Sequence, residues 1–257
     1  MKRHLILIAA LVILVPSLAF PNIVTLRLGY FLPKASGGPD SLWTIELDQM
    51  SFKKSDFNGT YMGFSYEYFA NRFLSFELSL DTYSKRKAGF YLDYVGYSLP
   101  EGDFAFPASL FEGAFDIAHS FNVSMTPLQL SAKIYPMGRR NRIVPYLGGG
   151  VSATFWTAGL RGEIVDFTDE WIYTDPDIGD VSIFGISQVD ARQSTRVAWG
   201  YHAFAGLMVP IGNRVTVSAE FRYQSAKGKF SDNGAFVGYE DFDLGGYALT
   251  AGLNYWF

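Results

Sequence analysis

The sequence predicts an all-β fold, a closed antiparallel eight-stranded transmembrane β-barrel with short periplasmic turns and long extracellular loops. Three observations predict it. The chain begins like an exported protein, apolar residues recur at every second position in eight segments, and the connections between these segments alternate between short and long. Side chains of a strand point to alternate faces, so each segment has one apolar face. A sheet that presents this face to lipid must close, because an open edge leaves unpaired backbone groups.

The N-terminus has the parts of a secretory signal peptide. Lys2 and Arg3 form a charged start, Leu5–Val15 is an apolar run, and Ser17-Leu18-Ala19 offers a cleavage site. The run is shorter than the roughly 20 residues of a membrane-spanning helix, and a retained anchor is the alternative. We expect residues 1–19 to be a signal peptide and 20–257 to be one barrel domain. The whole chain has 21 basic and 25 acidic residues, and cleavage would leave 19 basic and 25 acidic residues, a net charge of −6. A negative net charge does not favour nucleic acid as a partner.

Each of the eight segments carries apolar or aromatic residues on one face and small or polar residues on the other. In order, they are Val24–Tyr30, Met62–Tyr68, Leu74–Leu80, Leu128–Ile134, Leu147–Phe155, Trp199–Leu207, Val215–Tyr223 and Gly246–Phe257. The last segment ends the sequence on Tyr255, Trp256 and Phe257, which is unusual for a soluble domain because frayed termini favour polar residues. A membrane strand with aromatic residues at the interface has this pattern.

The order of the connections separates a membrane barrel from a soluble β-sandwich. Three are short, at 70–72, 138–142 and 210–214, and four are long, at about 32–59, 82–127, 156–196 and 224–243. Strict alternation is typical of an outer-membrane barrel, whereas a Greek-key sandwich does not require it. Trp43–Phe52 also alternates, and we expect it to be part of the first external loop or an extended segment above the membrane. Gly89–Tyr97 and Ile183–Arg196 are expected to extend barrel strands, and a ten-stranded barrel is the alternative.

The opposite face of the segments places charged side chains inside the barrel. These are Arg27, Glu67, Glu77, Asp81, Lys133, Glu220 and Arg222. An eight-stranded barrel is just wide enough for side chains to fill its interior, and buried charges must pair because an unpaired one is costly. We therefore predict a lumenal ionic network. It is interpreted either as an ionic core that plugs the barrel or as a narrow polar conduit.

The sequence gives little support for catalysis. His119 is followed by Ser120, but adjacent residues of a strand point to opposite faces, so this pair does not supply a nucleophile and its base. His202 is expected to form hydrogen bonds in the lumen. We predict that the protein is not an enzyme and has no cofactor, catalytic residue or metal centre with recognisable ligand spacing. Asp175, Asp177 and Asp180, in the acidic third loop, are a candidate loop cation site, although their spacing is not that of an EF-hand.

Several motifs resemble the outer membrane protein W family of small bacterial barrels. They are Phe64-Ser65-Tyr66-Glu67-Tyr68 with Phe76-Glu77-Leu78, Val144-Pro145-Tyr146-Leu147-Gly148-Gly149-Gly150, Trp199-Gly200 and the C-terminal Asn254-Tyr255-Trp256-Phe257. The resemblance implies an eight-stranded barrel in the bacterial outer membrane that passes small hydrophobic molecules. It also implies that Tyr255 and Phe257 belong to the ending that many such barrels use as an assembly signal, read by the barrel-assembly machinery. The charged lumen and the long second and third loops depart from the family pattern.

Two functional hypotheses follow. The first is an outer-membrane barrel that binds or passes small hydrophobic solutes. The second is a structural or surface-interaction barrel with a plugged ionic lumen, whose extracellular loops bind partners. In both, outer-membrane lipid and lipopolysaccharide are expected partners. A lipid-modifying enzyme is a distant third.

Overall fold

The computed structural model describes residues 22–138, 141–193 and 196–257, and the predicted signal peptide at 1–19 lies outside them. Within this part, eight long strands form the barrel wall. They are β1 (Ile23–Pro33), β2 (Gly59–Phe69), β3 (Leu74–Phe90), β6 (Ala118–Ile134), β7 (Val144–Asp175), β9 (Arg196–Pro210), β10 (Val215–Gly228) and β12 (Gly246–Trp256).

The wall closes on itself through antiparallel pairing of every neighbouring pair of these strands. The ring runs β1-β2-β3-β6-β7-β9-β10-β12 and returns to β1, with Ile23 opposite Trp256 at the closing seam. The predicted closed eight-stranded barrel is confirmed. The remaining strands β4 (Tyr94–Leu99), β5 (Gly102–Pro107), β8 (Gly179–Arg192) and β11 (Phe242–Asp243) lie outside the ring, so the ten-stranded alternative is wrong.

The period-two pattern places the apolar set outside and the polar set inside. Along β12, exposed and buried residues alternate from Gly246 to Tyr255. Leu26 and Leu249 are each 60% exposed on the outer face, whereas Thr25 and Thr250 are each 5% exposed on the inner face. Among the described residues, no helix has the length and apolar character needed to cross a bilayer.

The two ends of the barrel differ as expected. At the end that we call the short-turn end, connections 70–73 and 211–214 are tight, and 135–143 is somewhat longer than predicted and contains two of the undescribed positions. At the opposite, loop end, the strands run beyond the predicted loop boundaries. β3 reaches Phe90, β6 starts at Ala118 and β7 continues to Asp175.

The first long connection contains a helix where the sequence predicted an extended segment. Trp43–Phe52 belongs to the external connection, but Leu42–Gln49 form helix α2, and a 3-10 turn, η1, follows at Lys54–Phe57. The extended interpretation is wrong because the residues that are buried follow the helical period and not the alternation of Trp43, Ile45 and Leu47. α2 buries Leu42, Trp43 and Glu46.

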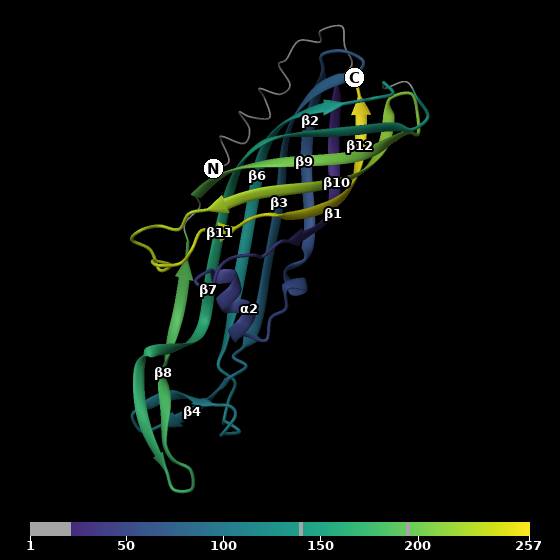
Figure 1. Cartoon of the computed structure of the whole chain (residues 1–257). Coiled ribbons are helices and arrows are strands. Elements are labelled where there is room, and N and C mark those ends of the chain that lie inside the picture. The colour runs from purple at the N-terminus through teal and green to yellow at the C-terminus, as the bar shows by residue number, and fades with distance from the viewer. Residues whose placement is uncertain (1–21, 139–140, 194–195) are drawn as a thin grey trace.

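A second unit projects beyond the loop end. Strand β4 pairs with β5, β5 pairs with β8, and β8 pairs with the far part of β7. We call these four strands the platform. In Figure 1, β4 and β8 lie at the end of the molecule opposite the C-terminus, with α2 between them and the barrel. Of the predicted strand extension Gly89–Tyr97, only Gly89 and Phe90 continue β3, because β4 begins a separate hairpin at Tyr94. Residues of Ile183–Arg196 do continue the wall, because β8 and then β9 pair with the same strand β7.

Candidate functional site: an ionic layer between two apolar plugs

The seven charged residues predicted for the lumen all lie on the inner face of the barrel and are buried, with exposed fractions of 6% or less. We call them the ionic layer. They come from five wall strands: β1 supplies Arg27, β2 supplies Glu67, β3 supplies Glu77 and Asp81, β6 supplies Lys133, and β10 supplies Glu220 and Arg222. Inward positions on neighbouring strands bring these side chains together inside the narrow ring.

Two arginines and three carboxylates form the centre of the ionic layer. Arg27 Nη1 lies 2.9 Å from Glu77 Oε1, and Arg27 Nη2 lies 3.4 Å from Asp81. Arg222 Nη2 lies 2.8 Å from Glu220 Oε1 and 3.6 Å from Glu77. Arg27 also lies 3.7 Å from Glu220, and Arg222 3.7 Å from Asp81. Each arginine therefore contacts all three carboxylates, which is a network rather than a set of separate pairs.

Lys133 links this centre to Glu67. Its Nζ lies 3.0 Å from Glu67 Oε2 and also contacts Glu77. The hydroxyls of Ser75 and Tyr135 donate hydrogen bonds to Glu67. The layer thus has three cations and four anions, and neutral donors supplement the cations. Such extra hydrogen bonds offset part of the cost of removing charges from water.

Aromatic side chains of the wall contact the ionic layer, and a glycine leaves space for one of them. Tyr146 donates a hydrogen bond of 3.1 Å to Glu220, and the guanidinium of Arg222 lies 4.6 Å from the ring centre of Phe204. Gly148 is the register partner of Phe204, and a Cβ at Gly148 would meet that ring. The absence of a side chain at Gly148 therefore leaves space for the Phe204 ring.

An apolar cluster, which we call the inner plug, closes the short-turn side of the ionic layer. It consists of Ile23, Phe69, Tyr135, Val144, Tyr146, Phe204 and Met208, with Trp256 packed against it. The ring centres of Phe69 and Trp256 are 5.5 Å apart, and those of Phe69 and Tyr135 are 5.3 Å apart. Aromatic side chains fill the barrel at this end.

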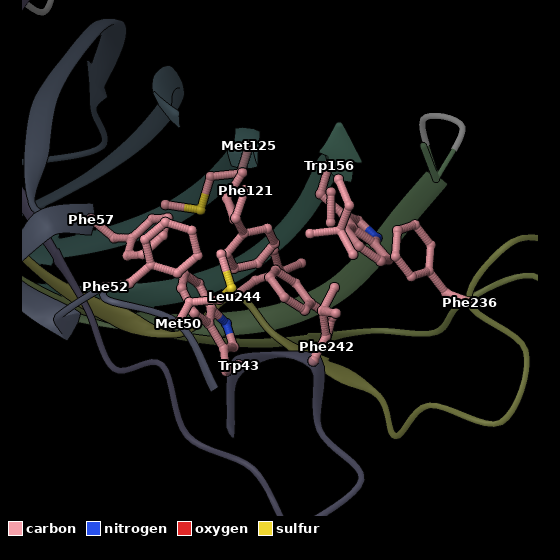
Figure 2. Packing of buried hydrophobic residues seen from close by; sticks show 14 of the residues in the cluster. Trp43, Met50, Phe52, Phe57, Phe121, Met125, Trp156, Phe236, Phe242 and Leu244 are labelled. Carbon is pink, nitrogen blue, oxygen red and sulfur yellow. The ribbon is translucent and has the colours of Figure 1, made fainter. Parts of the chain in front are cut away.

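A larger apolar cluster, which we call the outer plug, fills the loop side. The first connection, residues 34–58, supplies Trp43, Phe57 and their neighbours. Strand β6 of the wall supplies Phe121, and the fourth connection, residues 229–245, supplies Phe242. Figure 2 shows these rings gathered inside the strands. Trp43 is 1% exposed, its ring centre lies 5.2 Å from those of both Phe121 and Phe242, and its Nε1 donates to the carbonyl of Asp243 at 2.9 Å.

A buried polar contact fastens α2 to the wall, and sequence reasoning missed it. Nε2 of His119 on β6 lies 2.7 Å from Oε2 of Glu46 on α2. Ser120 points the other way, to the outer face, where its hydroxyl receives two hydrogen bonds from Arg86. His119 and Ser120 are thus on opposite faces, as the strand periodicity predicts. His202 lies in the lumen, with Nε2 2.7 Å from the Ser131 hydroxyl.

The three loop aspartates lie in and beside the turn between β7 and β8, with Asp175 ending β7 and Asp180 at the start of β8. Asp175 accepts hydrogen bonds from the backbone N–H groups of Asp177 and Ile178, and Asp180 accepts one from the Thr174 hydroxyl at 2.7 Å. In the described ranges, no group of three or more His, Cys, Asp or Glu side chains is placed to hold a metal ion. The structure therefore gives these carboxylates turn contacts and does not bring the three together.

The two residues of the predicted assembly signal lie on the outer face. Tyr255 is 46% exposed and Phe257 is 54% exposed. The backbone of Phe257 exchanges hydrogen bonds of 3.0 and 3.1 Å with Asn22, so the end of the chain is fixed to the start of β1. Recognition of this ending by assembly factors stays a prediction.

Comparison with solved structures finds several similar chains. Neisserial surface protein A is 13% identical with a TM-score of 0.46, and the alignment covers 92% of this chain and 97% of that one. Outer membrane protein W of E. coli is 16% identical with a TM-score of 0.42, covering 93% and 100%. The N-terminal β-barrel domain of OprF from Pseudomonas aeruginosa is 12% identical with a TM-score of 0.39, covering 92% and 97%.

No protein-family model matches the chain, and no curated protein matches it. The eight-stranded closure is therefore assigned from the strand pairing of this chain itself.

Proposed function

We propose that the protein is a closed, non-conducting barrel of the bacterial outer membrane that holds the platform outside the cell as a surface for partners. The observation that carries this proposal is the filling of the barrel from end to end. The inner plug, the ionic layer and the outer plug follow one another along the interior. Opening this interior would require separating buried charges, which costs several kcal/mol for each ion left unpaired.

The outer face of the wall supports placement in a membrane. Large apolar side chains are exposed around the ring, including Leu28 at 60%, Leu130 at 56%, Trp199 at 75% and Phe221 at 52%. A soluble protein rarely exposes such a continuous apolar surface. A closed barrel in lipid satisfies its backbone groups within the wall, as the bilayer requires.

The platform supports a role in binding at the cell surface. Phe104, Phe106 and Ile183 form a small core of their own, which holds the two hairpins together. Trp171 and Ile172 are 47% and 63% exposed near the tip. Exposed aromatic and apolar residues on a rigid sheet are typical of surfaces that bind other macromolecules.

Passage of small hydrophobic solutes, the other hypothesis from sequence, stays a prediction. It requires a path past Arg27, Glu77 and Arg222, and these side chains are packed and paired in this structure. The outer plug would also have to leave the mouth of the barrel.

Planar-bilayer recordings of the refolded protein test the closed interior. We expect no discrete conductance steps from inserted barrels. Reproducible steps from the wild-type protein would contradict the proposal.

Insertion itself is checked separately by fluorescence quenching with brominated lipids. Trp199 lies on the apolar outer face and Trp171 on the platform. We expect a Trp171→Phe protein to retain most of the quenching, and a Trp199→Phe protein to lose much of it. Equal loss in the two variants would contradict the proposed orientation of the barrel in lipid.

A further inference from the structure

A polar pocket lies on the outer surface where the wall strands β3, β6 and β7 meet the start of the platform at β8. It has a volume of about 260 Å³ and is lined by Arg86, Ser120, Asn122, Gly159, Leu160, Arg161, Asp190, Ala191 and Arg192. We propose that this pocket binds the phosphate group of an anionic lipid in the outer leaflet. The proposal rests on the membrane placement proposed above and identifies a lipid class for it.

The strand register places the pocket just beyond the apolar belt. On β7, the outward-facing residues Val151 and Phe155 are 57% and 41% exposed. The next positions of this face towards the loop end are Thr157 and Gly159, which are buried, and Arg161, which is exposed. On β3, Leu80 is followed outward by Thr82, Ser84 and Arg86. The wall therefore changes from apolar residues to hydroxyl residues to arginine. Gly159 lies about 13 Å along the strand from Phe155, at about 3.3 Å per residue.

The register also aligns two of the arginines across the wall. Arg86 on β3 lies opposite Asn122 on β6, Asn122 opposite Gly159 on β7, and Gly159 opposite Arg192 on β8. Glycine has no side chain, and the stem of Arg192 packs over Gly159, with its Cγ 3.6 Å from the position that a Cβ would take. The pocket of about 260 Å³ bordered by these residues is the space that we assign to an anion.

One arginine is oriented by the wall itself. Arg86 Nε and Nη2 donate to the Ser120 hydroxyl at 3.1 and 2.8 Å, and Ser120, 7% exposed, donates to the carbonyl of Arg161 at 3.1 Å. A guanidinium has five N–H donors, so Arg86 retains donors for a ligand. Fixing the side chain in advance reduces the entropy lost when it binds an anion.

The charge of the pocket favours an anion. Three arginines face one carboxylate, Asp190, whose Oδ2 lies 3.7 Å from Arg161 Nε. Both partners are more than two thirds exposed, so this ion pair is weak. Glu163, the next outward residue on β7, accepts a hydrogen bond from the Gln188 side chain at 3.1 Å. In the described part of the chain, Arg192 has no ion pair.

A lipid phosphate fits this position better than a soluble anion. Lipid headgroups occupy about 5–7 Å beyond each face of the hydrocarbon core, and long arginine side chains can reach back toward that surface. A lipid held in the belt would bring its phosphate to the pocket while its acyl chains pack on Leu80 and Phe155. Arginine guanidinium groups bind phosphate oxygens in a bidentate geometry.

The test uses the mature chain refolded in phosphatidylcholine nanodiscs that contain a small fraction of fluorescent, diphosphorylated lipid A. The variant is R86Q/R161Q/R192Q. The control, R72Q/R142Q/R214Q, removes the same charge from exposed positions at the short-turn end. Binding is measured by energy transfer from tryptophan. We expect at least about a tenfold loss of affinity in the variant and little change in the control.

Equal losses in the two triple variants, or none in either, would overturn the proposal. Lipid A without its phosphates should bind the wild-type protein as weakly as lipid A binds the variant. Inorganic phosphate should not displace lipid A at equal concentration; displacement would indicate a site for free anions and overturn the lipid assignment. Brominated-lipid quenching of the same samples reports insertion, so failure to insert is distinguished from failure to bind.

Discussion

The carboxylate of Glu46 on α2 and the imidazole of His119 on β6 meet at 2.7 Å, although the two residues are 73 positions apart in the sequence. Their side chains are 5% and 2% exposed. This contact ties α2 to the wall, and the hydrogen bond from Trp43 to the carbonyl of Asp243 on β11 ties the same helix to the fourth connection. The plug is therefore an attached part of the barrel rather than a loop resting on it.

Replacing Glu46 by alanine should loosen the plug. The change leaves the His119 imidazole buried without this partner, which costs about 1–3 kcal/mol. We expect faster hydrogen exchange of the backbone amides in residues 42–57 and a lower free energy of unfolding. Glu112→Ala removes an exposed carboxylate and is the control. Unchanged exchange in the Glu46 variant would show that the contact does not hold the plug.

Replacing Glu77 by alanine should destabilise the whole barrel. Glu77 contacts Arg27, Lys133 and Arg222 and is fully buried. Its removal leaves these cations short of a partner, and we expect a loss of about 3–5 kcal/mol. Urea unfolding in lipid vesicles measures it, with exposed Glu101→Ala as the control. A midpoint equal to that of the wild type would argue against a paired ionic layer.

Replacing Trp43 by alanine should weaken the outer plug without opening the barrel. Truncation of a buried Trp costs about 3–5 kcal/mol, so hydrogen exchange in residues 42–57 should increase. The ionic layer and the inner plug remain, and we expect no conductance. Trp171→Ala, on the platform, controls for loss of an indole. Conductance steps in the Trp43 variant would show that the outer plug alone seals the barrel.

Alkaline pH should destabilise the protein in part through Tyr91. This residue lies in the second connection at the loop end, and burial raises the pKa of its hydroxyl to about 12. Below its ordinary pKa of about 10, both folded and unfolded states are protonated. Between about pH 10 and 12 the unfolded state loses this proton first, so the free energy of unfolding falls as pH rises.

Tyr91→Phe should make the free energy of unfolding less dependent on pH across that window. Chemical unfolding at a series of alkaline pH values measures the slope. The variant also loses the hydrogen bond from the Val165 N–H to the Tyr91 oxygen, so it should be slightly less stable at neutral pH. An identical slope in both proteins would show that Tyr91 does not contribute.

The barrel was predictable because lipid imposes a local rule on every strand. Leu78 must face out and Glu77 must face in, and this alternation is visible without knowledge of any partner strand. The inward charges were visible for the same reason. Which cation contacts which carboxylate was not, because Arg27, Glu77 and Arg222 meet through the closure of the ring.

The plug and the arginine pocket depend on contacts that no local pattern reveals. Trp43, Ile45 and Leu47 alternate over too short a stretch to distinguish a strand from a helix, and only burial against Phe121 and Phe242 decides it. Arg86, Arg161 and Arg192 lie on three strands and look like ordinary surface residues in the sequence. The register of β3, β7 and β8 brings them together.

Strand β7 begins at Val144, at the short-turn end, and pairs with β8 as far as Asp175, at the tip of the platform. One continuous strand thus spans the molecule, pairing with β6 and β9 in the wall and with β8 beyond it, with a bulge between Asp166 and Glu170 as its bend. A partner pulling on the tip would load the same covalent strand that carries Tyr146 beside Glu220. Mechanical force on the platform would therefore be transmitted along β7 to the short-turn end of the barrel without passing through an irregular loop.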